Sequence, residues 1–369
     1  MTAMFSTPKS KTLSSRERVQ LALSRQEADR IPRAESFWPE TIPLWHTQGL
    51  PVGVDVARLF DFDILGGGWV HHEARPGYRE ILDETEEWQT RRDGNGAILR
   101  FWRNKSGTPE HVGFTVRTAD DWTRLKHDLL TTPVQCRIDL YSVLAAMHRA
   151  RSERRFFCWT GVECFEIAKD VIGHETLCIA MAEDPEWVAD LFDTETDVAL
   201  DALDYMEASG VRFDGGWIYG DIAYNHGPFC SPAMYRELVM PAHMRLVSWF
   251  KDRGLPVIYH TDGDFRPLIP SFLEVGIDCF QPLEAKANID VRELKPKWGS
   301  KVALMGNIDI MRLITNDPRA IEEEVAAKVP LAKRGGGYLY HSDHSVPPGV
   351  TWESYQHLMR LIDEYGRYE

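Results

Sequence analysis

Eight short apolar runs, separated by segments with helical periodicity, most constrain what this chain can fold into. The runs lie at 34–38, 62–66, 156–159, 213–219, 256–260, 277–282, 302–308 and 337–341. Between most of them apolar residues recur with a period of about 3.6, as at 232–251 and 318–333. Strands that alternate with helices are typical of parallel α/β folds, and eight such strands predict a (β/α)8 TIM barrel. An open doubly wound sheet is the alternative.

A long segment between the second and third runs interrupts this alternation. A polar turn at 93–96 separates 88–92 from 97–102, which indicates a β-hairpin, and 114–117 is a candidate third strand. We therefore expect an insertion at about 85–117 within one barrel domain spanning 13–369. The polar residues 1–12 predict a mobile N-terminus.

Composition excludes several classes of function. The 369 residues include 42 basic and 56 acidic side chains, a net charge of −14, which argues against nucleic acid or an anionic membrane as the main partner. The six cysteines contain no CxxC pair and predict buried free thiols in a reducing compartment. No apolar run approaches the roughly 18 residues of a membrane span, and the N-terminal segment has no signal-peptide core. A cytoplasmic protein is the expectation.

Histidines and acids follow several of the predicted strands, where TIM barrels place their chemistry. The clearest cluster is His260 and Asp262 after the fifth strand, with His341 and His344 after the eighth. Two imidazoles and a carboxylate suit a Zn²⁺ ion that keeps an open coordination position. The alternative is that His260 bonds a loop and His344 caps a helix, since the chain has neither an HExxH motif nor a cysteine cluster.

Four stretches carry a resemblance to a known family. They lie at 229–235 (FCSPAMY), 257–263 (VIYHTDG), 304–309 (LMGNID) and 337–348. The chain resembles the uroporphyrinogen decarboxylase superfamily, which includes a branch of cobalamin-linked methyltransferases. The resemblance implies a (β/α)8 barrel, often assembled as a homodimer.

Departures from the family pattern favour the methyltransferase branch. The true decarboxylase carries arginines after its first strand, whereas this chain has Glu35 and Glu40 there and no arginine at 35–41, so it would repel a polyanionic tetrapyrrole. The methyltransferases hold zinc with a His-x-Cys motif after strand five and a cysteine after strand eight. His260 matches the histidine, Asp262 stands at the first cysteine and His344 stands near the second. Such nitrogen and oxygen ligands leave zinc more electrophilic than thiolates do, which favours polarising a substrate oxygen.

The resulting hypothesis is a zinc-dependent methyltransferase that demethylates a methoxylated aromatic and passes the methyl group to a corrinoid, free or on a partner protein. His260, Asp262 and His344 are the predicted zinc ligands, and Glu163 or Asp221 is a proton donor or fourth ligand. The predicted substrate contacts are Glu35, Trp38, Trp69, Trp159, Trp217 and Glu284, although tryptophans at these places also serve as ordinary core. One alternative is a cobalamin-independent decarboxylase of a small aromatic acid. Another is a non-catalytic barrel that binds a corrinoid or a small ligand.

Overall fold

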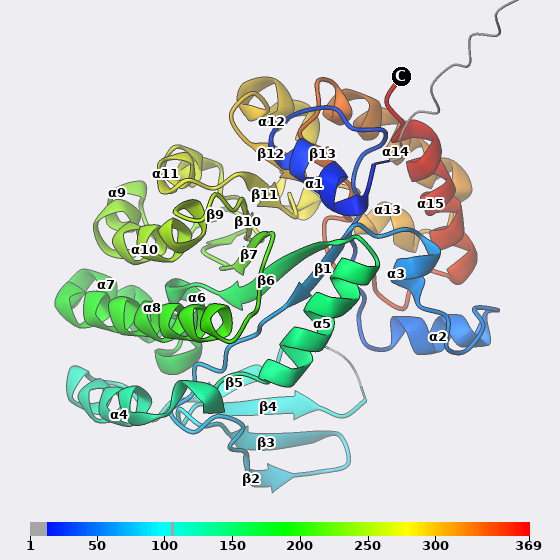
Figure 1. The fold of residues 1–369 in the computed structure, drawn as a ribbon. Helices are drawn as coiled ribbons and strands as arrows, with labels where there is room; N and C mark the ends of the chain where they lie inside the picture. The colour runs from blue at the N-terminus through cyan, green and yellow to red at the C-terminus, as the bar shows by residue number, and fades with distance from the viewer. Residues whose placement is uncertain (1–12, 105–106) are drawn as a thin grey trace, which may run out of the picture.

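A parallel sheet runs through the centre of the molecule (Figure 1). The computed structural model describes residues 13–104 and 107–369, so the predicted mobile N-terminus lies outside the described residues. Within these ranges seven strands pair in parallel, in the order β1 (Ile64–Gly67), β6 (Phe156–Val162), β7 (Gly215–Tyr219), β10 (Val257–His260), β11 (Cys279–Gln281), β12 (Ala303–Met305) and β13 (Tyr338–Leu339). All seven coincide with predicted apolar runs.

The run predicted as the first strand closes the ring without forming a regular strand. The amide of Tyr340 donates to the carbonyl of Pro32 at 2.8 Å, and the amide of Ala34 donates to the carbonyl of Tyr340 at 3.0 Å. On the other side, the amide of Asp63 donates to the carbonyl of Arg33 at 2.7 Å. The segment therefore lies between β13 and β1, and the predicted barrel is confirmed.

Side chains alternate between the inside and the outside of this ring, as the strand period of two requires. The inner core contains Ala34, Ile64, Phe156, Cys158, Trp217, Ile258, Cys279, Ala303, Met305 and Leu339. Helix α1 (Ser15–Leu23) adds Val19, Ala22 and Leu23 to this cluster. Its amide at Arg16 donates to the carbonyl of Arg154, just before β6 begins. Helix α1 therefore covers the N-terminal end of the barrel.

Helices surround the sheet on its outer side (Figure 1). They are α2 (Thr41–Thr47), α3 (Val56–Leu59), α4 (Ala119–Thr131), α5 (Leu140–Ser152), α6 (Cys164–Ile172), α7 (His174–Glu183), α8 (Pro185–Ala208), α9 (Pro232–Met234), α10 (Met240–Lys251), α11 (Ile269–Val275), α12 (Val291–Trp298), α13 (Ile310–Ile314), α14 (Pro318–Lys333) and α15 (Trp352–Tyr365). Among the described residues no helix is long and apolar enough to cross a membrane.

The insertion after β1 is a four-stranded antiparallel sheet beside α4 (Figure 1). The predicted hairpin is confirmed as β3 (Trp88–Arg92) and β4 (Ile98–Trp102), in which Trp88 pairs with Trp102. The third strand is β5 (Glu110–Gly113), a few residues before the predicted 114–117. Strand β2 (Glu80–Glu84) was not predicted, because an edge strand that is mostly exposed needs no apolar alternation.

A buried carboxylate ties the start of β1 to the N-terminal segment. The Asp63 side chain is fully buried and pairs with Arg18 at 2.6 Å and with Arg30 at 2.7 Å. It also accepts a hydrogen bond of 2.7 Å from the amide of Arg33. Asp63 therefore lies just before β1, at the end of the barrel where the parallel strands begin. The candidate site residues follow the opposite, carboxyl ends of the strands.

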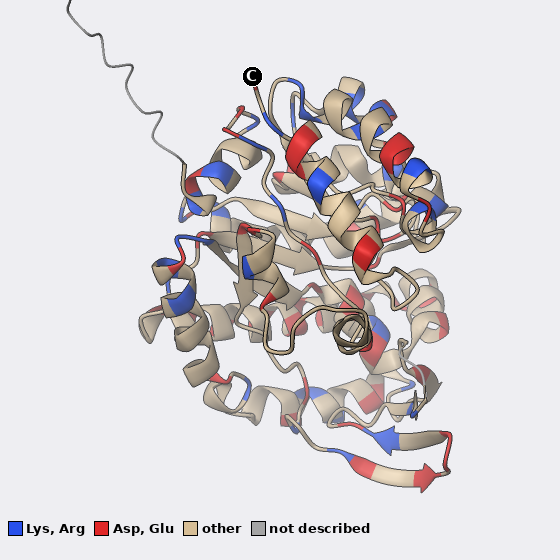
Figure 2. Ribbon diagram, turned by 90° about the vertical axis from the view of Figure 1, so that its right-hand side faces the viewer, with Lys and Arg blue, Asp and Glu red and all other residues tan. Residues whose placement is uncertain are grey.

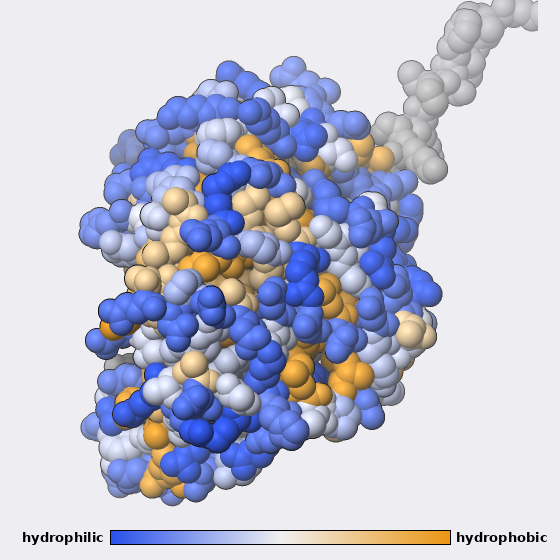
Figure 3. Space-filling model, turned by 90° about the vertical axis from the view of Figure 1, so that its left-hand side faces the viewer, coloured by the Kyte–Doolittle hydropathy of each residue, from blue (hydrophilic) through white to orange (hydrophobic). Residues whose placement is uncertain are grey.

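Charged, polar and apolar residues are mixed on the two faces drawn in Figures 2 and 3. Acidic and basic residues are interspersed along the helices drawn in Figure 2. On the opposite face, hydrophilic side chains surround an apolar area near the middle (Figure 3). A mixture of this kind is expected, because much of any folded surface is apolar.

Candidate metal centre

Three neighbouring strands end at the same level and bring their polar residues together. His260, the last residue of β10, pairs with Tyr219 of β7 and with Gln281 of β11. The chain then turns, and Asp221 follows β7 while Asp262 follows β10. Within the described residues, Asp221, His260 and Asp262 form the group of possible metal ligands, with ligand atoms all within 4.8 Å of one another.

The imidazole of His260 lies between the two carboxylates. Its Nε2 atom is 3.4 Å from Asp221 Oδ1 and 3.9 Å from Asp262 Oδ1. Its Nδ1 atom is 2.7 Å from Gln281 Oε1. The imidazole therefore presents one nitrogen to Gln281 and the other to the two acids.

Hydrogen bonds hold Asp221 in place, whereas one oxygen of Asp262 is left without any from the described residues. Asp221 Oδ1 accepts from the amide of Asp262 at 3.1 Å. The amide of Asp221 donates to Glu166 Oε2 at 3.0 Å, and Lys169 Nζ donates to the same oxygen at 2.6 Å. Asp262 Oδ1, in contrast, is buried and makes no hydrogen bond among the described residues. Since a buried carboxylate oxygen without a partner is costly, this atom is suited to a bound cation.

The electrostatics of the group are those of a site that attracts positive charge. Burial raises the pKa of Asp262 to about 6, and the charges of Asp221 and Glu284 add to this effect against that of His260. Burial opposes the charged form of His260, but its bond to Asp221 and the nearby carboxylates raise its pKa to about 9. Burial likewise opposes ionised Asp221, yet His260 holds its pKa well below the usual range.

These residues fit a zinc ion. Two ligand atoms about 2.1 Å from a tetrahedral zinc ion lie roughly 3.4 Å apart. The spacing of 3.4 Å between His260 Nε2 and Asp221 Oδ1 matches this value, and Asp262 Oδ1 is only slightly farther from Nε2 at 3.9 Å. One nitrogen and two oxygens leave a fourth position for a substrate atom, as catalytic zinc sites do.

Comparison of the sequence with models of known protein families identifies the family of this chain. A model described as uroporphyrinogen decarboxylase (URO-D) matches residues 104–365, most of the chain. The chain belongs to the URO-D family. The resemblance seen in the sequence is thereby confirmed.

Proteins similar to this chain include a methyltransferase and several uroporphyrinogen decarboxylases. The chain is 27% identical over 157 residues to a methylated-thiol–coenzyme M methyltransferase from Methanosarcina mazei, covering 41% of this chain and 38% of that protein. It is 28% identical over 184 residues to a uroporphyrinogen decarboxylase from Saccharophagus degradans, covering 49% of each. These matches thus span about two fifths to half of the relatives' length.

A solved structure shows the same fold over nearly the whole chain. It is a methyltransferase from Methanosarcina mazei, with a TM-score of 0.64 and 15% identity, covering 96% of this chain and 99% of the other. At this identity the likeness establishes the fold of this URO-D family member.

His344 lies outside the group that the structure assembles. The prediction named His260, Asp262 and His344, whereas the structure brings Asp221 to His260 and Asp262. The ring of His344 stacks on Trp38 with centroids 5.9 Å apart. It remains near the group, since its charge lowers the pKa of Asp262. The strand before His344, β13, is not a neighbour of β10 in the sheet, whereas β7 is.

Two of the predicted acids serve the local backbone. Glu163 caps α6, accepting from the amide of Phe165 at 2.8 Å and from that of Glu166 at 3.1 Å. Burial raises the pKa of Glu163 to about 7, but both of its oxygens are engaged. Its role as a proton donor stays a prediction. Glu284 accepts from the amide of Gly263 at 2.9 Å and so supports the loop that carries Asp262.

Glu35 lies in the barrel wall rather than on an open surface. Its side chain is fully buried, and Tyr340 donates its hydroxyl to Glu35 Oε2 at 2.7 Å. His341 Nδ1 is 3.5 Å from the other oxygen. Burial raises the pKa of Glu35 to about 7, against the hydrogen bonds it accepts. A contact of Glu35 with substrate stays a prediction.

This raised pKa gives an expected pH dependence of stability. A carboxyl group whose pKa rises from 4.5 in the unfolded chain to about 7 in the fold stabilises the protein fully below pH 4.5. That contribution is lost as the pH rises through 7. The stability of Glu35→Gln relative to the parent protein should therefore increase as the pH is raised from 5 to 8. Urea unfolding of both proteins at the two pH values tests this, and a difference that does not change with pH would refute it.

The four predicted tryptophans occupy different environments. Trp159 is fully buried and packs on Phe250 of α10, with centroids 5.7 Å apart. It points outward because its neighbour Cys158 faces the inner core, so the prediction that Trp159 contacts substrate is not supported by its position. Trp217 lies inside the barrel next to Gln281.

The other two tryptophans line cavities. Trp69 is half exposed and lines a cavity of about 230 Å³ with His72. Trp38 lines a cavity of about 350 Å³ with Phe101 and Trp102 of the insertion. Trp38 therefore lines this aromatic cavity and also stacks on His344.

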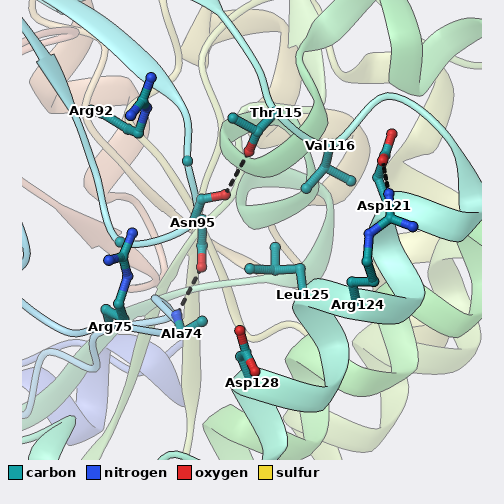
Figure 4. A pocket seen from close by; sticks show the side chains of 12 residues that line it. Ala74, Arg75, Arg92, Asn95, Thr115, Val116, Asp121, Arg124, Leu125 and Asp128 are labelled. Carbon is teal, nitrogen blue, oxygen red and sulfur yellow. Dashed lines mark hydrogen bonds and ion pairs between the residues drawn. The ribbon is translucent and has the colours of Figure 1, made fainter. Parts of the chain in front are cut away.

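A further cavity, of about 550 Å³, lies between the insertion and α4 (Figure 4). Asn95 braces its wall by accepting from the amide of Ala74 at 2.8 Å. Arg124 of α4 is paired with Asp121. None of the predicted site residues lines this cavity, so the cavity is separate from the metal centre.

Proposed function

We propose that this protein is a zinc-dependent methyltransferase that moves a methyl group from a small methoxylated aromatic to a corrinoid. The observation that carries the proposal is the group of Asp221, His260 and Asp262, in which Asp262 Oδ1 is buried and accepts no hydrogen bond from the described residues. His260 Nε2 and one oxygen of each acid would hold the ion. When bound, zinc supplies a Lewis acid that stabilises negative charge on the donor's ether oxygen.

The surrounding side chains favour a neutral aromatic donor. Asp221, Asp262 and Glu284 bring negative charge to the strand ends, which disfavours a polyanionic tetrapyrrole. Trp38 and His344 present a stacked pair of rings, and Tyr219 lies against His260 with centroids 5.0 Å apart. Rings of this kind stack on a planar substrate. The methyl group would leave without the electron pair of the broken C–O bond and would bond to the electron pair of the reduced corrinoid. The aryl oxygen would keep the C–O pair and take up a proton from water, which gives the phenol.

The reaction can be tested with purified protein loaded with Zn²⁺. Incubation with a methoxylated aromatic and reduced free cobalamin should produce methylcobalamin and the phenol in equal amounts. Removal of the metal by a chelator should abolish turnover, and added Zn²⁺ should restore it. Full activity in metal-free protein would contradict the proposal.

A decarboxylase is the second candidate, because the matching family model and several relatives are uroporphyrinogen decarboxylases. Release of carbon dioxide from a small aromatic acid, without methyl transfer, would favour it. The corrinoid partner protein and the homodimer are also proposals, and size-exclusion chromatography with light scattering tests the latter.

A further inference from the structure

Gln281, the last residue of β11, joins the metal centre to the barrel interior. It is 3% exposed. Its Oε1 atom is 2.7 Å from His260 Nδ1 and 3.2 Å from the indole nitrogen Nε1 of Trp217. One buried amide oxygen therefore contacts two ring nitrogens from the two neighbouring strands β10 and β7.

The chemistry of these three groups fixes where the hydrogen atoms lie. An indole N–H donates and never accepts, so the Gln281 atom that faces Trp217 is the carbonyl oxygen. That oxygen can only accept, so Nδ1 of His260 carries a hydrogen and donates it. The lone pair of a neutral imidazole is then on Nε2, the nitrogen that faces Asp221 and Asp262.

Trp217 is itself held firmly. Its ring stacks on Tyr219 with an interplanar angle of 9° and a centroid distance of 5.8 Å, and it meets the ring of His341 edge-on at 6.1 Å. The position of Trp217 is therefore set by packing on both sides. Its indole N–H in turn fixes the orientation of the Gln281 amide through their hydrogen bond.

We propose that Gln281, held by Trp217, is a positioning residue that selects the tautomer and ring orientation of His260 in which Nε2 binds the metal. The inference rests on the proposed metal centre and adds that tight zinc binding requires the hydrogen bond between Gln281 and His260. Hydrogen bonds of this kind to a ligating histidine orient the ring and raise its basicity.

The test measures Zn²⁺ affinity by competition with a chromogenic chelator. Gln281→Met keeps the volume but removes the acceptor, and it should bind Zn²⁺ about 10–100-fold more weakly than the parent protein. Gln281→Glu keeps an oxygen that accepts from both nitrogens, and it should bind at least as tightly as the parent. Trp217→Phe removes the indole donor and keeps an aromatic ring, and it should give a smaller loss than Gln281→Met. Gln20→Met on α1 is the matched control and should change nothing.

A second measurement reports the tautomer without any assay of activity. In zinc-loaded protein with ¹⁵N-labelled histidine, the His260 signals should show a protonated Nδ1 and a metal-bound Nε2, and Gln281→Met should lose this single state. The inference is overturned if Gln281→Met keeps both the parental affinity and the parental signals. Failure of the proposed function gives a different result, because the parent protein itself would then bind no Zn²⁺.

Discussion

Replacing His260 by alanine should remove specific zinc binding and reduce methyl transfer to background. His260 supplies the only nitrogen in the group of Asp221, His260 and Asp262. Loss of a ligand should cost more than the roughly 10–100-fold in metal affinity that is lost when a hydrogen-bond partner of a ligand is removed. It also leaves the carboxylates of Asp221 and Asp262 without the imidazole that lies between them. Zinc content after dialysis and the rate of methylcobalamin formation measure the two effects.

His357→Ala is the matched control for this change. His357 is a half-buried histidine of the outer helix α15 whose Nε2 lies 3.2 Å from the carbonyl of Pro318, and it is not part of the group of possible ligands. It should retain the parental zinc content and rate. Stoichiometric zinc in His260→Ala would contradict the assignment of the ligands.

The same experiment with His344→Ala separates two ligand sets. The structure stacks His344 on Trp38 and leaves it outside the group, so its loss should affect zinc affinity much less than the loss of His260. An equal loss in both variants would instead support the set predicted from sequence, His260, Asp262 and His344.

Replacing Asp63 by alanine should destabilise the protein by about 3–5 kcal/mol, the usual cost of breaking a buried ion pair. Asp63 is fully buried, and its removal leaves Arg18 and Arg30, whose side chains are 7% and 13% exposed, without this partner. The amide of Arg33 loses its acceptor as well. Urea denaturation followed by circular dichroism gives the change in unfolding free energy.

An exposed ion pair provides the comparison. Arg245 of α10 pairs with Asp193 and Asp197 on the surface, where its side chain is 41% exposed. Arg245→Ala should cost no more than about 1 kcal/mol. If the two substitutions cost the same, the buried network does not hold β1 as described.

Much of the barrel could be predicted from the sequence because seven of the eight apolar runs contain a strand of the parallel sheet. The run at 34–38 was the exception, forming only isolated bridges such as Phe37 with Val346. The outward direction of Trp159 could not be predicted either. Barrel strands are buried on both faces, so their sequence does not show which side faces the interior.

The candidate site was predicted in part for a similar reason. His260 and Asp262 were grouped because they follow the same strand. Asp221 was given only a secondary role, as a proton donor or fourth ligand. The predicted barrel places its strand beside that of His260, but the sequence does not show that the turn after β7 brings the Asp221 carboxylate within 3.4 Å of His260 Nε2. Gln281 was missed as a functional residue, although it ends a strand directly next to His260. A polar residue at the end of an apolar run was the signal that could have found it.

Anomalous diffraction at the zinc edge, from crystals of the protein soaked in Zn²⁺, tests the central claim most directly. We expect one strong peak about 2.0–2.2 Å from His260 Nε2 and from an oxygen of Asp262 and of Asp221. A peak elsewhere on the molecule, or none at these strand ends, would contradict the metal centre and the chemistry proposed for it.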